Sequence, residues 1–223
     1  MSAVFFGSLS TLADTSELQR RAFNDAFAAH GLGWQWSRDD YVQMLASSGG
    51  ADRVTAYAAA RGVNVDADAV HETKSRLFQD LLRAEPLAPR PGVVDTIATA
   101  REHGHRLGFV TTTSRANIDA VLASLAPHVT ATMFDLIVDR DSVHHPKPNP
   151  EAYEYALRQL AEQAGHAVAI EDNLGGVAAA GGAGVECIAF PNSNTLGSDF
   201  SAAADVTQVL DPALVLSLLF GDR

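Results

Sequence analysis

Hydroxyl, lysine and carboxylate side chains occur together in four short segments of this sequence, 5–15, 108–115, 146–148 and 170–173. Thr111 can donate a hydrogen bond to a phosphate oxygen, and Lys147 can neutralise the phosphate charge. Glu171 and Asp172 are adjacent carboxylates, and Mg²⁺ prefers oxygen ligands of this kind. Each segment alone is a weak signal. Together they indicate a site for a phosphate group with a metal ion beside it.

The elements that must position these segments alternate between short apolar runs and helical patterns. Runs typical of buried strands lie at 3–6, 107–110, 134–138, 168–170 and 185–190. Each run ends at polar or turn residues. This alternation favours an α/β fold with a Rossmann-like parallel-sheet core. Ligands of such sheets bind outside the carboxyl ends of the strands, so we expect the four segments to meet there.

A long helical stretch interrupts the alternation after the first strand. Residues 16–84 show only helical patterns, and strands resume after the Pro-rich segment 86–92. Asp14, followed three residues later by Glu17, resembles a capping box and predicts a helix start near 14–16. We therefore predict a core domain formed by 1–14 plus 88–223, with a helical cap domain at 15–87 inserted into it.

Composition excludes several classes of protein. The 223 residues include 16 Lys+Arg against 27 Asp+Glu, a net charge of −11. Nucleic acids and anionic membranes are bound by basic surfaces, so we expect neither as a partner. The single Cys187 excludes an intramolecular disulfide and a metal site built from cysteines. No apolar run approaches the roughly 20 residues of a membrane helix, and we expect a cytoplasmic protein.

These segments, in this order, resemble the haloacid dehalogenase superfamily, in particular its CbbY and β-phosphoglucomutase-like branch. The resemblance covers nearly the whole chain and includes 18–27, 34–36, 90–92, 111–115, 147–148 and 170–184. It implies a Mg²⁺-dependent phosphotransferase that acts on small phosphorylated metabolites, often sugar phosphates. It also implies three sets of contacts: phosphate binding by Thr111, Thr112 and Lys147, substrate contact from the cap by Arg53 and Lys74, and binding of a metal or a lysine by Asp172 and Glu171.

The first motif departs from the family pattern. That pattern is Asp-x-Asp-Gly-Thr-Leu-x-Asp-Thr/Ser, in which the first Asp attacks phosphorus and binds Mg²⁺ and the second shuttles a proton. Alignment on residues 11–15 places Gly7 at the nucleophile and Leu9 at the acid/base. Gln19 stands where the mutases have a helper His. Since glycine has no nucleophile and leucine has no proton to give, the family's covalent route cannot run through these side chains.

Three hypotheses about function follow. In the first, the chain is a catalytically impaired member of the family that binds a small phosphorylated metabolite or inorganic phosphate, as a monomer or homodimer. The lost carboxylates remove a metal ligand and make the pocket less negative, which predicts weaker Mg²⁺ binding and phosphate binding that depends less on Mg²⁺. In the second, it is an active Mg²⁺-dependent phosphatase or phosphomutase using water activated by Glu171 or Asp172. In the third, it is a structural or regulatory subunit without a ligand.

Overall fold

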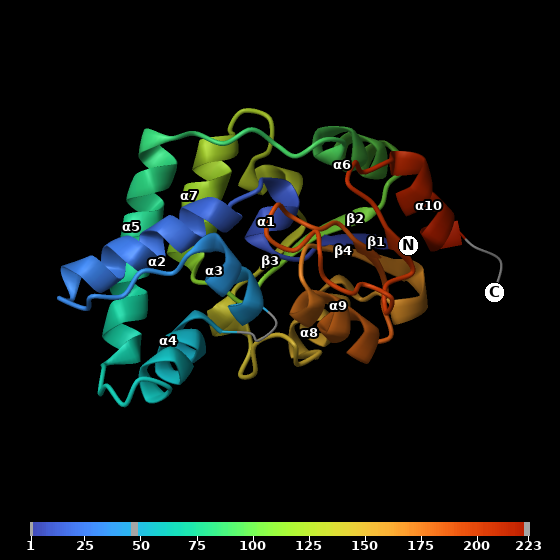
Figure 1. The fold of residues 1–223 in the computed structure, drawn as a ribbon. Helices are drawn as coiled ribbons and strands as arrows, with labels where there is room; N and C mark the ends of the chain where they lie inside the picture. Colours follow the sequence, from blue (N-terminus) through green and yellow to red (C-terminus); the bar gives the residue numbers. More distant parts are fainter. Residues whose placement is uncertain (1, 46–48, 221–223) are drawn as a thin grey trace.

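A six-stranded parallel sheet forms the centre of the computed structural model, which describes residues 2–45 and 49–220 (Figure 1). The strand order is β3-β2-β1-β4-β5-β6. The strands are β1 (Ala3–Phe6), β2 (Arg106–Val110), β3 (Leu136–Val138), β4 (Ala167–Glu171), β5 (Glu186–Ala189) and β6 (Asp205–Val206). The predicted α/β class with a parallel-sheet core is confirmed.

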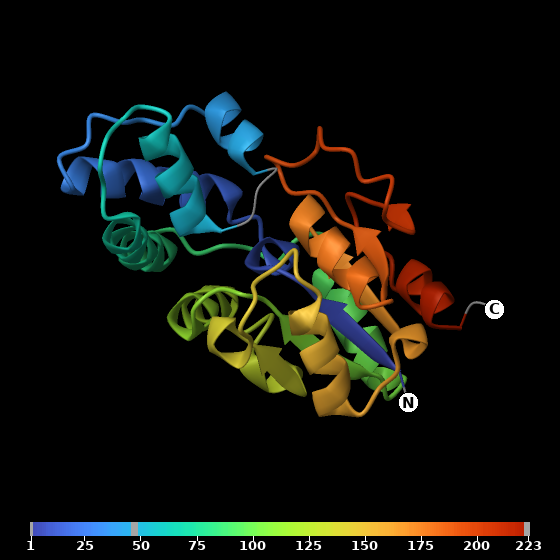
Figure 2. The same ribbon diagram turned by 90° about the horizontal axis from the view of Figure 1, so that it is seen from below.

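Helices cover both faces of the sheet, and the central strand shows why. Val4 and Phe6 of β1 pack into one apolar cluster, while Ala3 and Phe5 pack into another on the opposite face. Alternate side chains of a strand point to opposite faces, so a strand covered on both sides is apolar throughout. The first face is covered by α6 (Val93–Glu102), α7 (Arg115–Leu125) and α10 (Pro212–Phe220). The second is covered by α8 (Glu151–Leu160) and α9 (Leu174–Gly182) (Figure 2).

The cap consists of helices that share a third apolar cluster. These helices are α2 (Ser16–Ala29), α3 (Arg38–Met44), α4 (Gly50–Ala59) and α5 (Ala67–Ala84). Trp36 is fully buried at the centre of the cluster, with its ring centroid 4.8 Å from that of Phe23 and 4.7 Å from that of Phe27. The described residues between 16 and 84 contain no strand, as the sequence predicts. The domain boundaries at 14/15 and 87/88 stay a prediction.

Local details differ from the sequence-based expectation at three places. Helix α2 starts as expected, but its cap residue, Thr15, makes no side-chain capping bond. Asp14 instead accepts hydrogen bonds from the Ser16 amide and, across the fold, from the Ser193 amide. The run predicted at 134–138 becomes a strand only from Leu136, because a 3₁₀ turn precedes it. The two-residue β6 is exposed and carries no apolar pattern that could predict it.

Arg90 joins the Pro-rich segment 86–92 to the loops beside the strand ends. Its Nη1 donates to the carbonyl oxygens of Ser10 and Phe190, both at 2.8 Å, and its Nη2 donates to that of Pro191 at 2.6 Å. The guanidinium also lies 3.3 Å from the centroid of the Phe190 ring. One side chain thus joins its own segment to the short helix α1 (Leu9–Leu12) after β1 and to the loop after β5.

The Arg90 contacts predict a loss of stability when the guanidinium is replaced. Arg90→Lys should lower the free energy of unfolding by about 2–4 kcal/mol, because an ammonium cannot reach three carbonyls in different directions. Arg101 also donates to backbone carbonyls but is exposed, so Arg101→Lys should cost less than about 1 kcal/mol. Urea unfolding of both variants checks this. Equal losses would show that the Arg90 fork has no special role.

Candidate functional site

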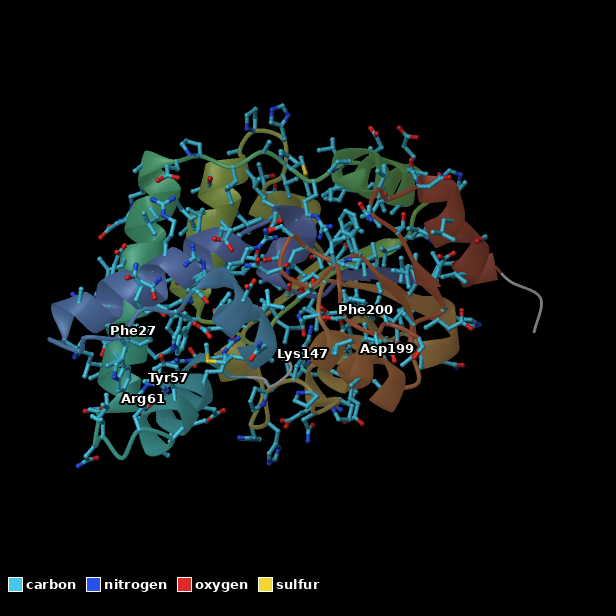
Figure 3. All side chains as sticks on the ribbon, viewed as in Figure 1. Phe27, Tyr57, Arg61, Lys147, Asp199 and Phe200 are labelled. Carbon is cyan, nitrogen blue, oxygen red and sulfur yellow. The ribbon has the colours of Figure 1, made fainter. Side chains whose placement is uncertain are left out.

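A cavity of about 290 Å³ lies between the carboxyl ends of the strands and the cap. The structure brings nearly all the predicted site residues to it: Gly7, Leu9, Gln19, Arg53, Lys74, Thr111, Thr112, Lys147 and Asp172. Glu171 is the exception and does not line the cavity. Figure 3 labels Lys147 near the middle of the view, between the cap helices and the helices of the core.

Glu171 and Lys147 form a buried ion pair. Lys147 Nζ lies 2.6 Å from Glu171 Oε1, and the Tyr153 hydroxyl donates to the same oxygen at 2.8 Å. Lys147 Nζ also donates to the carbonyl oxygens of Gly7 at 3.0 Å and Val110 at 2.7 Å. Burial raises the pKa of Glu171, and the charge of Lys147 opposes that rise. The carboxylate of Glu171 is therefore committed to Lys147 rather than open to a ligand.

The carboxylate of Glu171 also occupies the space beside Gly7. A Cβ atom on Gly7 would lie 2.2 Å from Glu171 Cδ, and one on Gly176 would lie 2.0 Å from it. Such distances are far below van der Waals contact, so the carboxylate fits only because both positions are glycine. The sequence predicts the missing nucleophile at position 7. It does not predict that another carboxylate fills the space, because Gly176 reads as an ordinary helix-packing glycine.

Asp172 is held by three neutral donors. Its Oδ1 accepts from the Ser8 hydroxyl and from Asn173 Nδ2 at 2.8 Å, and its Oδ2 accepts from Asn192 Nδ2 at 2.5 Å. Sequence reasoning missed Ser8 and Asn192. Ser8 lies in the degenerate first motif, and Asn192 follows the end of β5, where polar residues of a parallel sheet gather. Leu9, at the acid/base position, packs into the apolar core.

The core wall of the cavity offers hydroxyl groups at the end of β2. The Thr111 amide donates to the Val138 carbonyl at 3.1 Å, which fixes the loop. The Thr111 hydroxyl accepts a 3.3 Å hydrogen bond from the Thr113 amide, which leaves its proton available to a ligand. Thr112 lines the cavity next to it. These groups lie on the same wall as Lys147, as a phosphate site requires.

The cap wall carries two cations that share one aromatic ring. Lys74 Nζ lies 4.8 Å from the centroid of Phe23, and Arg53 Cζ lies 5.9 Å from it. Lys74 Nζ also donates to the side-chain oxygen of Gln19. Burial, and then the charge of Arg53, lower the pKa of Lys74 to about 7. Burial, followed by the charge of Lys74, lowers the pKa of His71 to about 4.

Within the part of the chain that the structure describes, neither Lys74 nor Arg53 forms an ion pair with a carboxylate. The buried Arg53 Nε has no hydrogen-bond partner there. Gln19 is therefore more than an eroded position, because its amide oxygen accepts the hydrogen bond from Lys74. The cap wall presents positive charge to the cavity and leaves it uncompensated.

The fold and site place this chain among the hydrolases of the haloacid dehalogenase type. The sequence profile of the haloacid dehalogenase-like hydrolase family matches residues 1–184, and the chain belongs to this family. It is 40% identical to the protein CbbY of Cereibacter sphaeroides over 90% of this chain and 89% of that protein. It is 36% identical to CbbY of Rhodobacter capsulatus, with 91% of both chains covered.

Solved structures agree with the sequence comparison. The crystal structure of CbbY from Rhodobacter sphaeroides in complex with phosphate has a TM-score of 0.85 and 37% identity, with 94% of both chains covered. An Asp-to-Asn mutant of the same protein, in complex with xylulose-(1,5)bisphosphate, also has a TM-score of 0.85, at 36% identity. The resemblance inferred from the motifs is confirmed.

Hydrolases of this family typically use Mg²⁺, but the donor set of this chain does not fit that ion well. Position 7 supplies no carboxylate, and Glu171 is paired with Lys147. Asp172 remains, with both oxygens accepting hydrogen bonds from neutral donors. Among residues 2–45 and 49–220, no group of three or more His, Cys, Asp or Glu side chains is arranged to hold a metal. Mg²⁺ prefers several oxygen ligands in near-octahedral geometry.

Two glycines of α9 provide a test of the position of Glu171. Gly181→Ala should raise the free energy of unfolding by about 0.5–1 kcal/mol, because alanine favours helix and no atom lies within 4 Å of the new Cβ. Gly176→Ala in the same helix should instead lower it by about 1–3 kcal/mol, because the Glu171 carboxylate must move. Thermal unfolding of both variants measures this. A stabilising Gly176→Ala would place the carboxylate elsewhere.

The lowered pKa of Lys74 predicts how stability depends on pH. The unfolded chain binds this proton more tightly than the folded chain, so the contribution of Lys74 to stability should rise between pH 7 and the ordinary lysine pKa near 10.5. The slope should approach about 1.4 kcal/mol per pH unit. Lys74→Met removes the titrating amine. The free energy of unfolding of this variant should therefore exceed that of wild type at pH 7, and the difference should narrow toward pH 10.

The control for Lys74→Met is Arg76→Met, an exposed cation on the same helix. Its difference in stability from wild type should not change with pH, because guanidinium groups stay protonated in proteins. Urea unfolding at several pH values measures both variants. A Lys74→Met margin that is constant from pH 7 to 10 would contradict the assignment.

Proposed function

We propose that this chain binds a small phosphorylated metabolite, such as a sugar bisphosphate, in the cavity and does not hydrolyse it through an aspartyl intermediate. The observation that carries the proposal is the arrangement around Gly7. The nucleophile position has no side chain, and Glu171 fills the space beside it while pairing with Lys147. Binding and chemistry separate in this way because binding uses ground-state contacts, whereas the chemistry needs the nucleophile.

Phosphate-binding groups on the core wall and positive charge on the cap wall support a ligand with two anionic groups. Lys147, Thr111 and Thr112 serve one phosphate at the strand ends. Arg53 and Lys74 line the cavity from the cap, and neither is paired with a carboxylate of the described residues; Arg53 serves the second anionic group, and Lys74 contacts the ligand beside it. The CbbY of Rhodobacter sphaeroides, crystallised with phosphate and with xylulose-(1,5)bisphosphate, supports this class of ligand for the related chain.

The missing groups predict little or no turnover by the family route. In the serine protease subtilisin, loss of the nucleophile lowers the rate on the order of 10⁶-fold. Leu9 cannot protonate a leaving group. Slow hydrolysis by a water molecule is the second candidate function. Asp172 favours this candidate, because its carboxylate is the one found among the described residues that line the cavity. Glu171 is a poor candidate for that role, because it is bonded to Lys147 and Tyr153.

Calorimetry and phosphate release together test the proposal. Xylulose 1,5-bisphosphate and inorganic phosphate should each bind the wild-type chain, with affinities that change little when Mg²⁺ is removed. Thr111→Val should weaken binding roughly 10-fold to 100-fold, because a hydrogen bond to a charged group is lost. Wild type should release no phosphate from a panel of sugar phosphates.

Two kinds of control accompany this experiment. Thr99→Val, at a half-buried position of α6 that does not line the cavity, should bind like wild type. Gly7→Asp/Leu9→Asp restores both family carboxylates and forces Glu171 away from Gly7, so any turnover it gains should require Mg²⁺. Strict Mg²⁺ dependence of binding, or wild-type release near the rate of the double variant, would contradict the proposal. Release abolished by Asp172→Asn would favour the water route, and a lack of all binding would favour a subunit without a ligand.

A further inference from the structure

The sequence contains two lysines, Lys74 and Lys147, and its other Lys+Arg residues are all arginines. Both lysines are buried and both line the same cavity, one from the cap and one from the core. Guanidinium groups stay protonated in proteins, whereas an ammonium can lose its proton when it is buried. The chemistry of side-chain amines in this chain is therefore confined to one cavity.

The two amines have opposite surroundings. Lys147 Nζ is bonded to the Glu171 carboxylate, to two carbonyl oxygens and, at 3.3 Å, to the Tyr153 hydroxyl. Among the described residues, Lys74 Nζ donates to one hydrogen-bond acceptor, the Gln19 amide oxygen, and otherwise faces the rings of Phe23 and Phe78 at 4.8 and 5.3 Å. Four acceptors fix the first amine as part of a network, whereas the second is free to meet a ligand.

Burial, and then the charge of Arg53, favour the neutral form of Lys74. Arg53 approaches from α4, His71 lies one turn away on the same helix, and α2 contributes the uncharged Gln19. With a pKa of about 7, roughly half of this amine is neutral at pH 7, against about 1 in 3,000 for an ordinary lysine. A desolvated lysine beside another cation is a recognised way to obtain a nucleophilic amine.

We propose that Lys74 forms an imine with the carbonyl carbon of a phosphorylated ketone or aldehyde held in the cavity. The Nζ lone pair adds to the carbonyl carbon to give a carbinolamine. The carbonyl oxygen then leaves as water together with the two amine hydrogens, and a C=N bond replaces C=O. No oxidant, reductant or further reactant is needed. This inference rests on the proposed function, since the phosphate-binding groups of the core wall and Arg53 of the cap wall must first bring such a ligand into the cavity.

A ketose phosphorylated at both ends is the kind of ligand that suits this reaction. In a 2-ketopentose 1,5-bisphosphate, the hydroxyl that would close a five-membered ring is esterified. Such a sugar therefore stays open and presents a free ketone between its two phosphates. With Lys147 and the threonines at one phosphate and Arg53 at the other, Lys74 on the cap wall faces the carbon skeleton between them. The imine would hold the ligand covalently and reversibly in a chain that lacks the groups to hydrolyse it.

Reductive trapping tests the imine directly. The full chain is incubated near pH 7 with sodium cyanoborohydride and either xylulose 1,5-bisphosphate or hydroxyacetone, a small ketone without phosphate. Intact mass and peptide mapping then locate the adduct among the two lysines and the amino terminus. We expect one adduct per chain at Lys74, and in Lys74→Met at least about tenfold less labelling, limited to the amino terminus. The thermal transition of Lys74→Met verifies that it folds.

The two probes separate this inference from the proposed function. No adduct at Lys74 with either probe, or equal labelling of Lys147, overturns the imine. Calorimetric binding of the bisphosphate without an adduct also overturns it and leaves the proposed function standing. An adduct of hydroxyacetone at Lys74, in a chain that binds no bisphosphate, supports the reactive amine and removes the proposed function instead.

Discussion

The ion pair between Lys147 and Glu171 is the interaction on which the rest of the site depends. A charge without exposure to water needs a partner, and breaking such a pair by removing one member typically costs 3–5 kcal/mol. With no carboxylate at Gly7, Lys147 takes its counter-charge from Glu171 and spreads its remaining hydrogen bonds over two carbonyls and Tyr153. Gly176 is then required because the carboxylate passes against its Cα.

The cap shows the opposite electrostatic situation. Lys74 and Arg53 are drawn into an aromatic environment around Phe23 with no carboxylate to balance them. Their burial is unfavourable in the ligand-free chain, and an anionic ligand would relieve it. A protein of net charge −11 thus keeps a locally positive cavity wall, which attracts an anionic metabolite to the cavity.

The sequence predicts the sheet, the cap and most of the cavity for identifiable reasons. Apolar runs that stop at polar residues locate the strand ends, and the order of the motifs assigns Thr111 and Lys147 to them. The contacts of Glu171 are not predictable in this way, because they depend on a side-chain conformation and on Gly176 in a later helix. The bond between Gln19 and Lys74 joins two cap helices whose relative rotation no local pattern encodes. Strand β6 is missed because two exposed residues carry no periodicity.

The placement of both lysines in one cavity also determines how the surface of the molecule reacts with enzymes and reagents that modify amines. Acetylation, methylation and the attachment of ubiquitin-like proteins act on lysine amines. The folded surface presents none, since Lys74 and Lys147 are both buried. Amine-directed dyes and crosslinkers meet the same restriction and have only the amino terminus to react with outside the cavity. Acylation of either lysine by a bulky reagent would therefore identify a molecule that has opened, and the chain carries its own internal reporter of unfolding.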